Sequence, residues 1–158
     1  MRCLVTGATG FIGSFLVEHL AGQDHEVTAL VRDPAKALRV LPRGVRLVVG
    51  SVEDRASCDA AVAASRPEQV FHLAAQSYPQ LSWQEPQATF RANILGTLQL
   101  LEAMRKADHE ARIVMAGSSA EYAVRPGGEA IAEGDRLDPA SPYGVSKVAA
   151  EMAAALVA

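Results

Sequence analysis

Short apolar runs alternate with amphipathic segments along most of the chain. The apolar runs are residues 3–5, 27–31, 45–49, 70–73 and 112–116. Runs of this kind are typical of strands that are buried on both faces of a parallel sheet. Apolar residues recur at helical spacing between them, at residues 11–22, 34–40, 54–65, 86–106 and 141–156. The alternation predicts an α/β fold built as a doubly wound parallel sheet of at least five strands.

The segment 117–142 interrupts this alternation. It contains Gly127, Gly128 and Gly134 together with several prolines, and its apolar residues follow no period. A long connection without regular structure is uncommon inside a compact domain unless it carries a function. We therefore expect a functional loop between the fifth strand and the last helix.

Composition narrows the class of protein. With 158 residues, 49% of them hydrophobic, the chain is long enough for one core, and we expect a single domain over residues 1–158. A net charge of −3 without clustered Lys or Arg argues against a nucleic-acid partner. Cys3 and Cys58 have neither metal-site nor disulfide spacing, and no apolar run approaches the roughly 18 residues of a membrane span. We expect no metal, no membrane contact and a cytoplasmic location.

Three glycines follow the first predicted strand directly. Gly7, Gly10 and Gly13 have the Gly-x-x-Gly-x-x-Gly spacing and precede an amphipathic helix. Such a turn lets the backbone approach a pyrophosphate closely and directs helix-terminal N–H groups at it. Glycine patterns also occur in ordinary turns, but the position between strand and helix favours a dinucleotide site.

The end of the second predicted strand bears on the choice of cofactor. An acidic residue here would hold the ribose hydroxyls of NAD, but Val31 fills this position. Arg32 follows and can pair with a 2′-phosphate, which favours NADP slightly, whereas Asp33 is close enough to keep NAD open. Arg32 also has a simpler interpretation as a solvated loop cation.

Tyr143 and Lys147 stand four residues apart near the end of the chain. A helix places such residues on one face, so a phenol that exchanges a proton lies beside an ammonium that stabilises its anion. With the glycine turn, this pair predicts hydride chemistry beside a nucleotide cofactor.

Four ordered motifs resemble those of the extended short-chain dehydrogenase/reductase family, the NAD-dependent epimerases and dehydratases with a Rossmann-like fold. The motifs are residues 6–13, 72–75, 93–97 and 142–147. Residues 74–78 and 82–86 are similar to the branch of GDP-mannose 4,6-dehydratase and GDP-4-keto-6-deoxymannose reductase. The resemblance covers nearly the whole chain, but the family's members are longer, and their C-terminal substrate domain is absent here.

The resemblance implies an oxidoreductase, epimerase or dehydratase that acts on a nucleotide sugar. It implies that Tyr143 is the catalytic acid and base, that Lys147 assists it and holds the nicotinamide ribose, and that Ser118 polarises the C4 oxygen. On spacing alone, Ser118 or Ser119 would simply end a strand. The implied cofactor-binding residues are Gly7, Thr9, Gly10, Phe11, Ile12, Gly13, Arg32, Ser51, Val52, Leu73, Ala74, Ala75, Asn93, Tyr143 and Lys147. A nucleotide-sugar substrate and a second copy of the chain are the expected partners.

Other residues keep two interpretations. His72, at an apolar strand end, is better explained as a hydrogen-bonded structural residue than as a catalyst, and Tyr78 and Trp83 suit either a sugar pocket or local packing. The chain as a whole also fits a non-catalytic dinucleotide-binding module, or a reductase of a non-sugar carbonyl.

Three positions depart from the family's pattern. Ser51 stands where an aspartate usually accepts from the adenine, and Ala123 replaces a glycine. Ala120 stands where dehydratases carry an acid, and we expect the neighbouring Glu121 to be turned away by its one-residue offset. Elimination of water is thereby disfavoured relative to reduction or epimerisation. Because the substrate half is missing, we expect this chain alone to be inactive.

Overall fold

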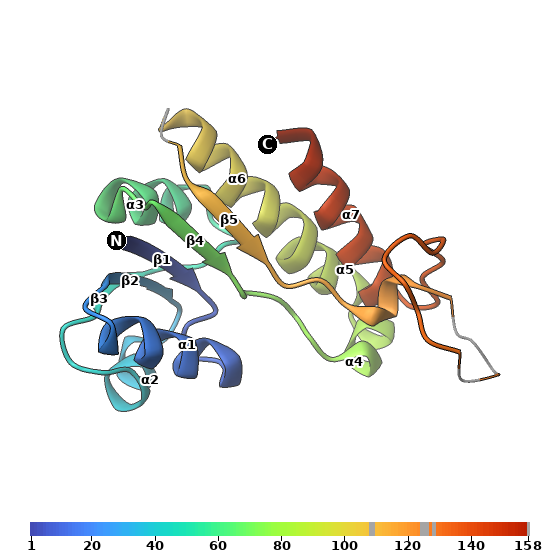
Figure 1. The fold of residues 1–158 in the computed structure, drawn as a ribbon, viewed down its shortest axis with the longest axis horizontal. Helices are drawn as coiled ribbons and strands as arrows, with labels where there is room; N and C mark the ends of the chain where they lie inside the picture. Colours follow the sequence, from blue (N-terminus) through green and yellow to red (C-terminus); the bar gives the residue numbers. More distant parts are fainter. Residues whose placement is uncertain (108–109, 124–126, 128, 158) are drawn as a thin grey trace.

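A five-stranded parallel sheet forms the centre of the computed structural model, which describes residues 1–107, 110–123, 127 and 129–157 (Figure 1). The strands are β1 (Arg2–Thr6), β2 (Glu26–Val31), β3 (Arg46–Val49), β4 (Gln69–His72) and β5 (Arg112–Met115). Their order in the sheet is β3-β2-β1-β4-β5. The predicted α/β class and parallel five-strand sheet are confirmed, and each strand lies within two residues of its predicted position.

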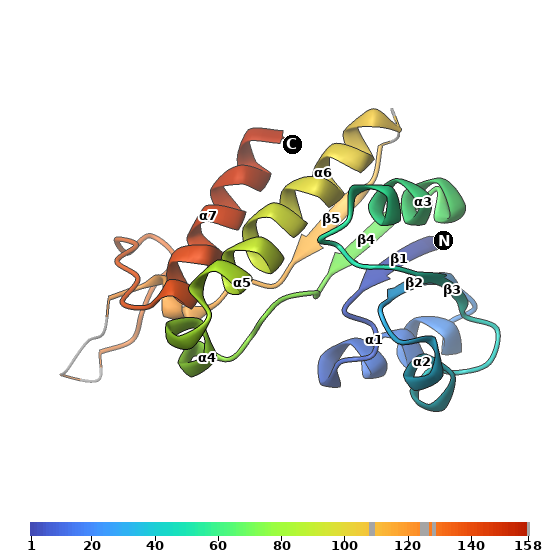
Figure 2. The same cartoon turned by 180° about the vertical axis from the view of Figure 1, so that it is seen from behind.

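Helices cover both faces of this sheet (Figures 1 and 2). The elements are α1 (Phe11–Gly22), α2 (Pro34–Val40), α3 (Arg55–Ser65), α4 (Pro79–Gln84), α5 (Pro86–Phe90), the π-helix η1 (Arg91–Leu95), α6 (Gly96–Lys106), the 3-10 helix η2 (Ser119–Glu121) and α7 (Pro142–Val157). Helices α1 and α2 lie on one face. Helices α3 and α6 lie on the other, and α7 packs beside α6.

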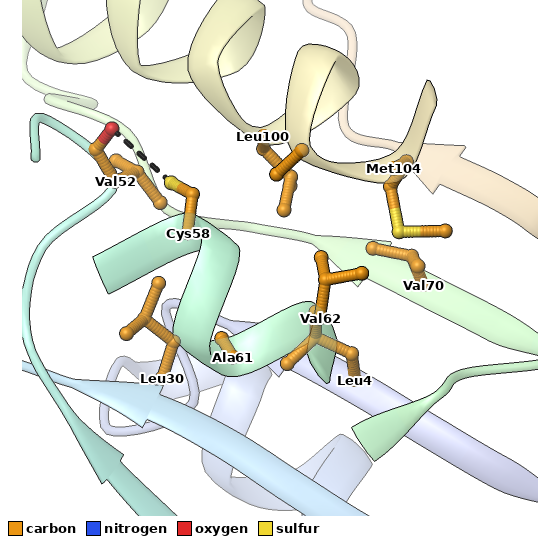
Figure 3. Close-up of a cluster of buried hydrophobic side chains, with 10 residues drawn as sticks. Leu4, Leu30, Val52, Cys58, Ala61, Val62, Val70, Leu100 and Met104 are labelled. Carbon is orange, nitrogen blue, oxygen red and sulfur yellow. Dashed lines mark hydrogen bonds between the residues drawn. The ribbon is translucent and has the colours of Figure 1, made fainter. Parts of the chain in front are cut away.

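Alternation along the strands divides the core in two. On β1, Leu4 faces the α3 and α6 side, whereas Cys3 and Val5 face α1 and α2. Figure 3 shows the first cluster, in which Leu4 packs with side chains of β2, α3, β4 and α6. Cys58 belongs to it, and burial raises the pKa of its thiol to about 11. Both cysteines are free and buried, which fits their predicted structural role.

Two helical predictions need correction. Helix α4 was not expected, because residues 79–84 have no apolar period. The single helix expected over residues 86–106 is in fact α5, η1 and α6 in succession. A π-helical segment inserts one residue into the turn and frequently marks a functional site. Asn93 lies at the centre of η1 and is 2% exposed.

The segment 117–142 contains more local structure than its sequence indicated. Helix η2 begins directly after Ser118, and Tyr122 forms an isolated antiparallel bridge with Leu137. Gly128, one of the glycines that suggested a loop here, lies outside the described residues. Among the described helices, none combines the length and the apolar character needed to cross a membrane.

Candidate dinucleotide and catalytic site

The turn between β1 and α1 is closed by glycines that leave no space for side chains. Gly7 has a φ of 70°, and a Cβ there would lie 2.6 Å from the carbonyl carbon of Leu73. A Cβ on Gly13 would lie 2.2 Å from the carbonyl oxygen of Gly7. The backbone N–H of Gly10 donates to the same Gly7 oxygen at 3.0 Å. These contacts hold the start of α1 tightly against the ends of β1 and β4.

This turn suits an anion. The first turn of α1 has no acidic residue, and Gly10 gives it no side-chain cap. The helix-terminal N–H groups of such a turn are free to meet a phosphate, and the helix dipole favours negative charge there. Phe11 and Ile12 are 83% and 66% exposed beside the turn, and Thr9 is half-buried within it. This turn, residues 7–13, which we call the glycine cradle, therefore fits the pyrophosphate of a dinucleotide.

The predicted cofactor contacts at the ends of β2 and β3 differ in burial and in hydrogen bonding. Val31 is buried and Arg32 is exposed, while the Oδ1 of Asp33 accepts from the backbone N–H of Lys36 at 3.0 Å and caps α2. The hydroxyl of Ser51 accepts from the N–H of Glu53 at 3.2 Å. The predicted contact Val52 has its side chain buried in the core, next to Gly96 of α6. Only the backbone of Val52 therefore remains for a ligand.

Five of the predicted residues meet at the end of β4. Leu73, Ala74, Ala75, Asn93 and Lys147 line one cavity of about 10 Å³, although they are up to 74 positions apart in the sequence. The amide of Asn93 is already bonded within the protein. Its Oδ1 accepts from the N–H of Gln76 at 2.7 Å, and its Nδ2 donates to the Gln76 carbonyl at 3.0 Å.

Ser118 and Lys147 meet in a larger groove of about 1050 Å³ along β5, α6 and α7. Ser118 caps η2, and its hydroxyl accepts from the N–H of Ala120 at 3.2 Å. Burial lowers the pKa of Lys147, and the nearby Glu121 opposes that shift. Tyr143 is half-buried one helical turn before Lys147 on α7. The predicted catalytic residues thus come from the N-terminus of η2, just after β5, and from α7, which packs against η2.

Glu121 has a role that the sequence did not indicate. It is 3% exposed, and its Oε1 accepts from the backbone N–H of Ser118 at 2.6 Å. The carboxyl group therefore fixes the backbone of the predicted catalytic serine. Burial and a hydrogen bond to the carboxyl of Glu151 raise the pKa of Glu121, which favours its protonated form.

Replacing Glu121 by Gln should make the protein's stability less sensitive to pH. Because the folded protein raises the pKa of Glu121, the stability that this group contributes is complete below its unfolded pKa and is lost as the pH rises through its folded pKa. The amide oxygen of Gln can still accept from Ser118 but carries no proton to lose. Urea unfolding at pH 4.5 and pH 8 should show Glu121→Gln gaining stability relative to wild type as the pH rises. The exposed Glu18→Gln is the matched control, and equal pH profiles for the two variants would contradict the assignment.

Two functional residues were missed from the sequence. Gly144 lies beside Tyr143, and a Cβ on it would lie 2.3 Å from the carbonyl oxygen of Ala120, so only glycine lets α7 approach η2 this closely. Ser146 is fully buried, and its hydroxyl donates to the Tyr143 carbonyl at 2.7 Å. For Gly144, the available signal in the sequence was a glycine in the first turn of a helix. For Ser146, the sequence contained no comparable signal.

Comparison with known proteins identifies the family of this chain. The sequence profile described as the NAD dependent epimerase/dehydratase family matches residues 3–158. A GDP-mannose 4,6-dehydratase of Sordaria araneosa is 37% identical over 151 residues, which cover 91% of this chain and 27% of that protein. A UDP-glucose 4-epimerase of Mycoplasma pneumoniae is 31% identical over 157 residues, covering 96% of this chain and 46% of that protein. The chain thus spans less than half the length of these two relatives.

Solved structures give the same result. UDP-glucose 4-epimerase of Thermus thermophilus, in complex with NAD, superposes with a TM-score of 0.92 at 37% identity, covering 99% of this chain and 50% of that one. UDP-glucose 4-epimerase of Thermotoga maritima, with UDP-glucose, gives 0.86 at 31% identity, covering 99% and 51%. Relatives of this chain therefore include both epimerases and dehydratases, and the GDP-mannose branch is not singled out.

Proposed function

Because the chain belongs to the NAD dependent epimerase/dehydratase family, we propose that it is the cofactor-binding part of an NAD-dependent enzyme that acts on a nucleotide sugar. The observation that carries the proposal is spatial. The glycine cradle and the helix that bears Tyr143 and Lys147 lie at the same end of the sheet, where ligands of open α/β sheets bind. In this proposal, residues 1–158 form one dinucleotide-binding domain.

The cofactor is held along the carboxyl ends of the strands. Backbone N–H groups of Phe11, Ile12 and Gly13 bind the pyrophosphate. Ser51 and the Val52 backbone lie at the adenine end, and Lys147 binds the nicotinamide ribose. Phe11 and Ile12 cover the cradle with apolar surface. NAD supplies the acceptor and donor of hydride when it is bound. The solved structures of the Thermus thermophilus epimerase and of MoeE5 hold NAD, so they do not support the preference for NADP that Arg32 suggested.

Replacing Arg32 by Ala tests that preference directly. Arg32 is exposed, so a charge-assisted contact with a 2′-phosphate is partly screened, and we expect Arg32→Ala to weaken NADP binding by about 1–2 kcal/mol. NAD lacks this phosphate, so its affinity should stay the same. Calorimetric titration of wild type and variant with both cofactors measures the difference. An unchanged NADP affinity would remove Arg32 from the site.

The catalytic step follows from three side chains. Tyr143 takes the proton of the C4 hydroxyl as that carbon is oxidised and returns it when the carbonyl is reduced. Lys147, four residues later on α7, supplies a positive charge on the same face of the helix. Ser118 donates a hydrogen bond to the C4 oxygen, and Glu121 keeps the Ser118 backbone in place.

Reduction or epimerisation suits this site better than elimination. Elimination needs an acid beside the sugar, and Ala120 supplies none. The neighbouring Glu121 has its carboxyl bound to Ser118 and Glu151, away from such a role. We therefore place the reaction with the epimerases and reductases of the family.

The free edge of β5 should lead to self-association. Within the described chain, β5 pairs only with β4, and Val114 on it is 45% exposed. Unpaired strand edges with apolar side chains are templates for pairing with another chain. Sedimentation velocity should show species larger than a monomer, in a concentration-dependent way. A strict monomer at the highest soluble concentration would contradict this expectation.

A further inference from the structure

Buried hydrogen bonds run in a chain across the sheet, from the glycine turn to the π-helix. The backbone N–H of Ala74 donates to the hydroxyl of Thr6 at 3.2 Å. That hydroxyl lies 2.7 Å from Nδ1 of His72, and Nε2 of His72 lies 2.9 Å from the hydroxyl of Thr97. Thr6, His72 and Thr97 are at most 5% exposed. Water therefore does not compete for these bonds.

The last acceptor in this series of hydrogen bonds determines which group donates and which accepts in each of them. The hydroxyl of Thr97 donates to the carbonyl of Asn93 at 2.6 Å, and a carbonyl oxygen can only accept. Since this uses the one hydroxyl hydrogen, His72 must donate to Thr97 from Nε2. Its Nδ1 then accepts from Thr6. Burial and the charge of Lys147 lower the pKa of His72 to about 4, which agrees with a neutral imidazole near pH 7.

Asn93 continues the connection to the catalytic helix. Its side-chain Nδ2 donates to the hydroxyl of Ser146 at 2.9 Å, and Ser146 donates to the carbonyl of Tyr143. The backbone carbonyl of Asn93 accepts the hydrogen bond from Thr97, which in turn is bonded to His72. Asn93 therefore links His72, through Thr97, to the first turn of α7, through Ser146.

We propose that His72 is a positioning residue that aligns the first turn of α7 with the glycine turn. Its imidazole has one donor and one acceptor. The acceptor binds Thr6, which directly precedes the glycine turn, and the donor binds Thr97, which is bonded to Asn93. The purpose of this alignment rests on the proposed function, because the alignment sets the position of Tyr143, the proposed acid and base, relative to the cofactor. The alignment itself is a property of this chain and is measurable without a substrate.

Amide hydrogen exchange of the 158-residue chain tests the proposal. His72→Leu leaves the Thr6 and Thr97 hydroxyls without their partner, and a buried bond lost in this way raises local opening roughly tenfold or more. We expect this increase in residues 142–147 beyond any change in α3. Val70→Ala, on the same strand and in the core, is the matched control and should raise exchange in both regions alike.

Rescue separates positioning from simple packing. His72→Gln presents an amide donor and acceptor in place of the imidazole and should return much of the protection in residues 142–147. If His72→Leu does not fold, Thr97→Val breaks the same chain at its next member, and Thr28→Val is its buried control. A uniform rise in exchange, equal to that of Val70→Ala, or no rescue by Gln, would overturn the proposal. Failure of wild type to bind NAD would instead count against the proposed function and leave the exchange result intact.

Discussion

Gly13→Ala should abolish measurable NAD binding and destabilise the protein. The new Cβ would lie 2.2 Å from the Gly7 carbonyl oxygen and 2.9 Å from Cα of Ala8, and backbone atoms cannot move aside as a side chain can. Overpacking of this kind costs about 1–3 kcal/mol of folding free energy, and sometimes more. Displacing the turn also breaks N–H bonds to a charged pyrophosphate worth about 1.5–3 kcal/mol each, so affinity should fall by about 100-fold or more.

Gly22→Ala is the matched control on the same helix. Nothing lies within 4 Å of the position that its Cβ would take, and Gly22 is the last residue of α1. We expect unchanged NAD affinity and a stability gain of up to about 1 kcal/mol, because alanine loses less backbone freedom than glycine on folding. Calorimetry and urea unfolding measure both. Equal NAD affinity in the two variants would mean that the cradle does not hold the cofactor.

The second large effect concerns turnover. We expect the 158-residue chain alone to convert no nucleotide sugar, because holding the sugar carbon against the nicotinamide supplies roughly 7–11 kcal/mol of the barrier. That positioning draws on binding of the remote nucleotide, and the chain spans about half of the solved epimerases. Fusion to the C-terminal half of the Thermus thermophilus epimerase should restore epimerisation of UDP-glucose, measured by coupled oxidation of the product.

Tyr143→Phe in this fusion should lower kcat by roughly 10²–10⁴-fold, since it removes the group that moves the proton. NAD affinity should stay nearly unchanged, because the ring is retained. Glu18→Gln, at an exposed residue of α1 with no assigned role in the site, is the control and should keep full activity. Turnover by the 158-residue chain alone would mean that the sugar pocket is built within it or between its copies. The chain would then not depend on a second half.

The strands and the glycine turn could be predicted because their signals are local. Residues 27–31 and 112–116 are apolar except for Thr28 and Arg112, and burial on both faces of a sheet favours such runs. Helix α4 was missed because its packing, and not an apolar period, stabilises it. The buried Ser82 shows this, since its hydroxyl accepts from the N–H of Tyr143, which is 61 residues away.

The connections within the site could not be predicted, for the same reason. Thr6 and His72 are 66 residues apart, and His72 and Thr97 are 25 apart. Each looks ordinary in its own segment, and only the parallel pairing of β1 with β4 and the packing of α6 bring them together. The residue types of the candidate site could therefore be identified from the sequence, whereas the hydrogen bonds that position them are determined by the tertiary structure.

Titration of the purified 158-residue chain with NAD by calorimetry tests the central claim most directly. The account predicts saturable binding with one NAD per chain, which is lost in Gly13→Ala and kept in Gly22→Ala. The absence of any binding by a wild-type chain that is shown to be folded by circular dichroism would contradict it.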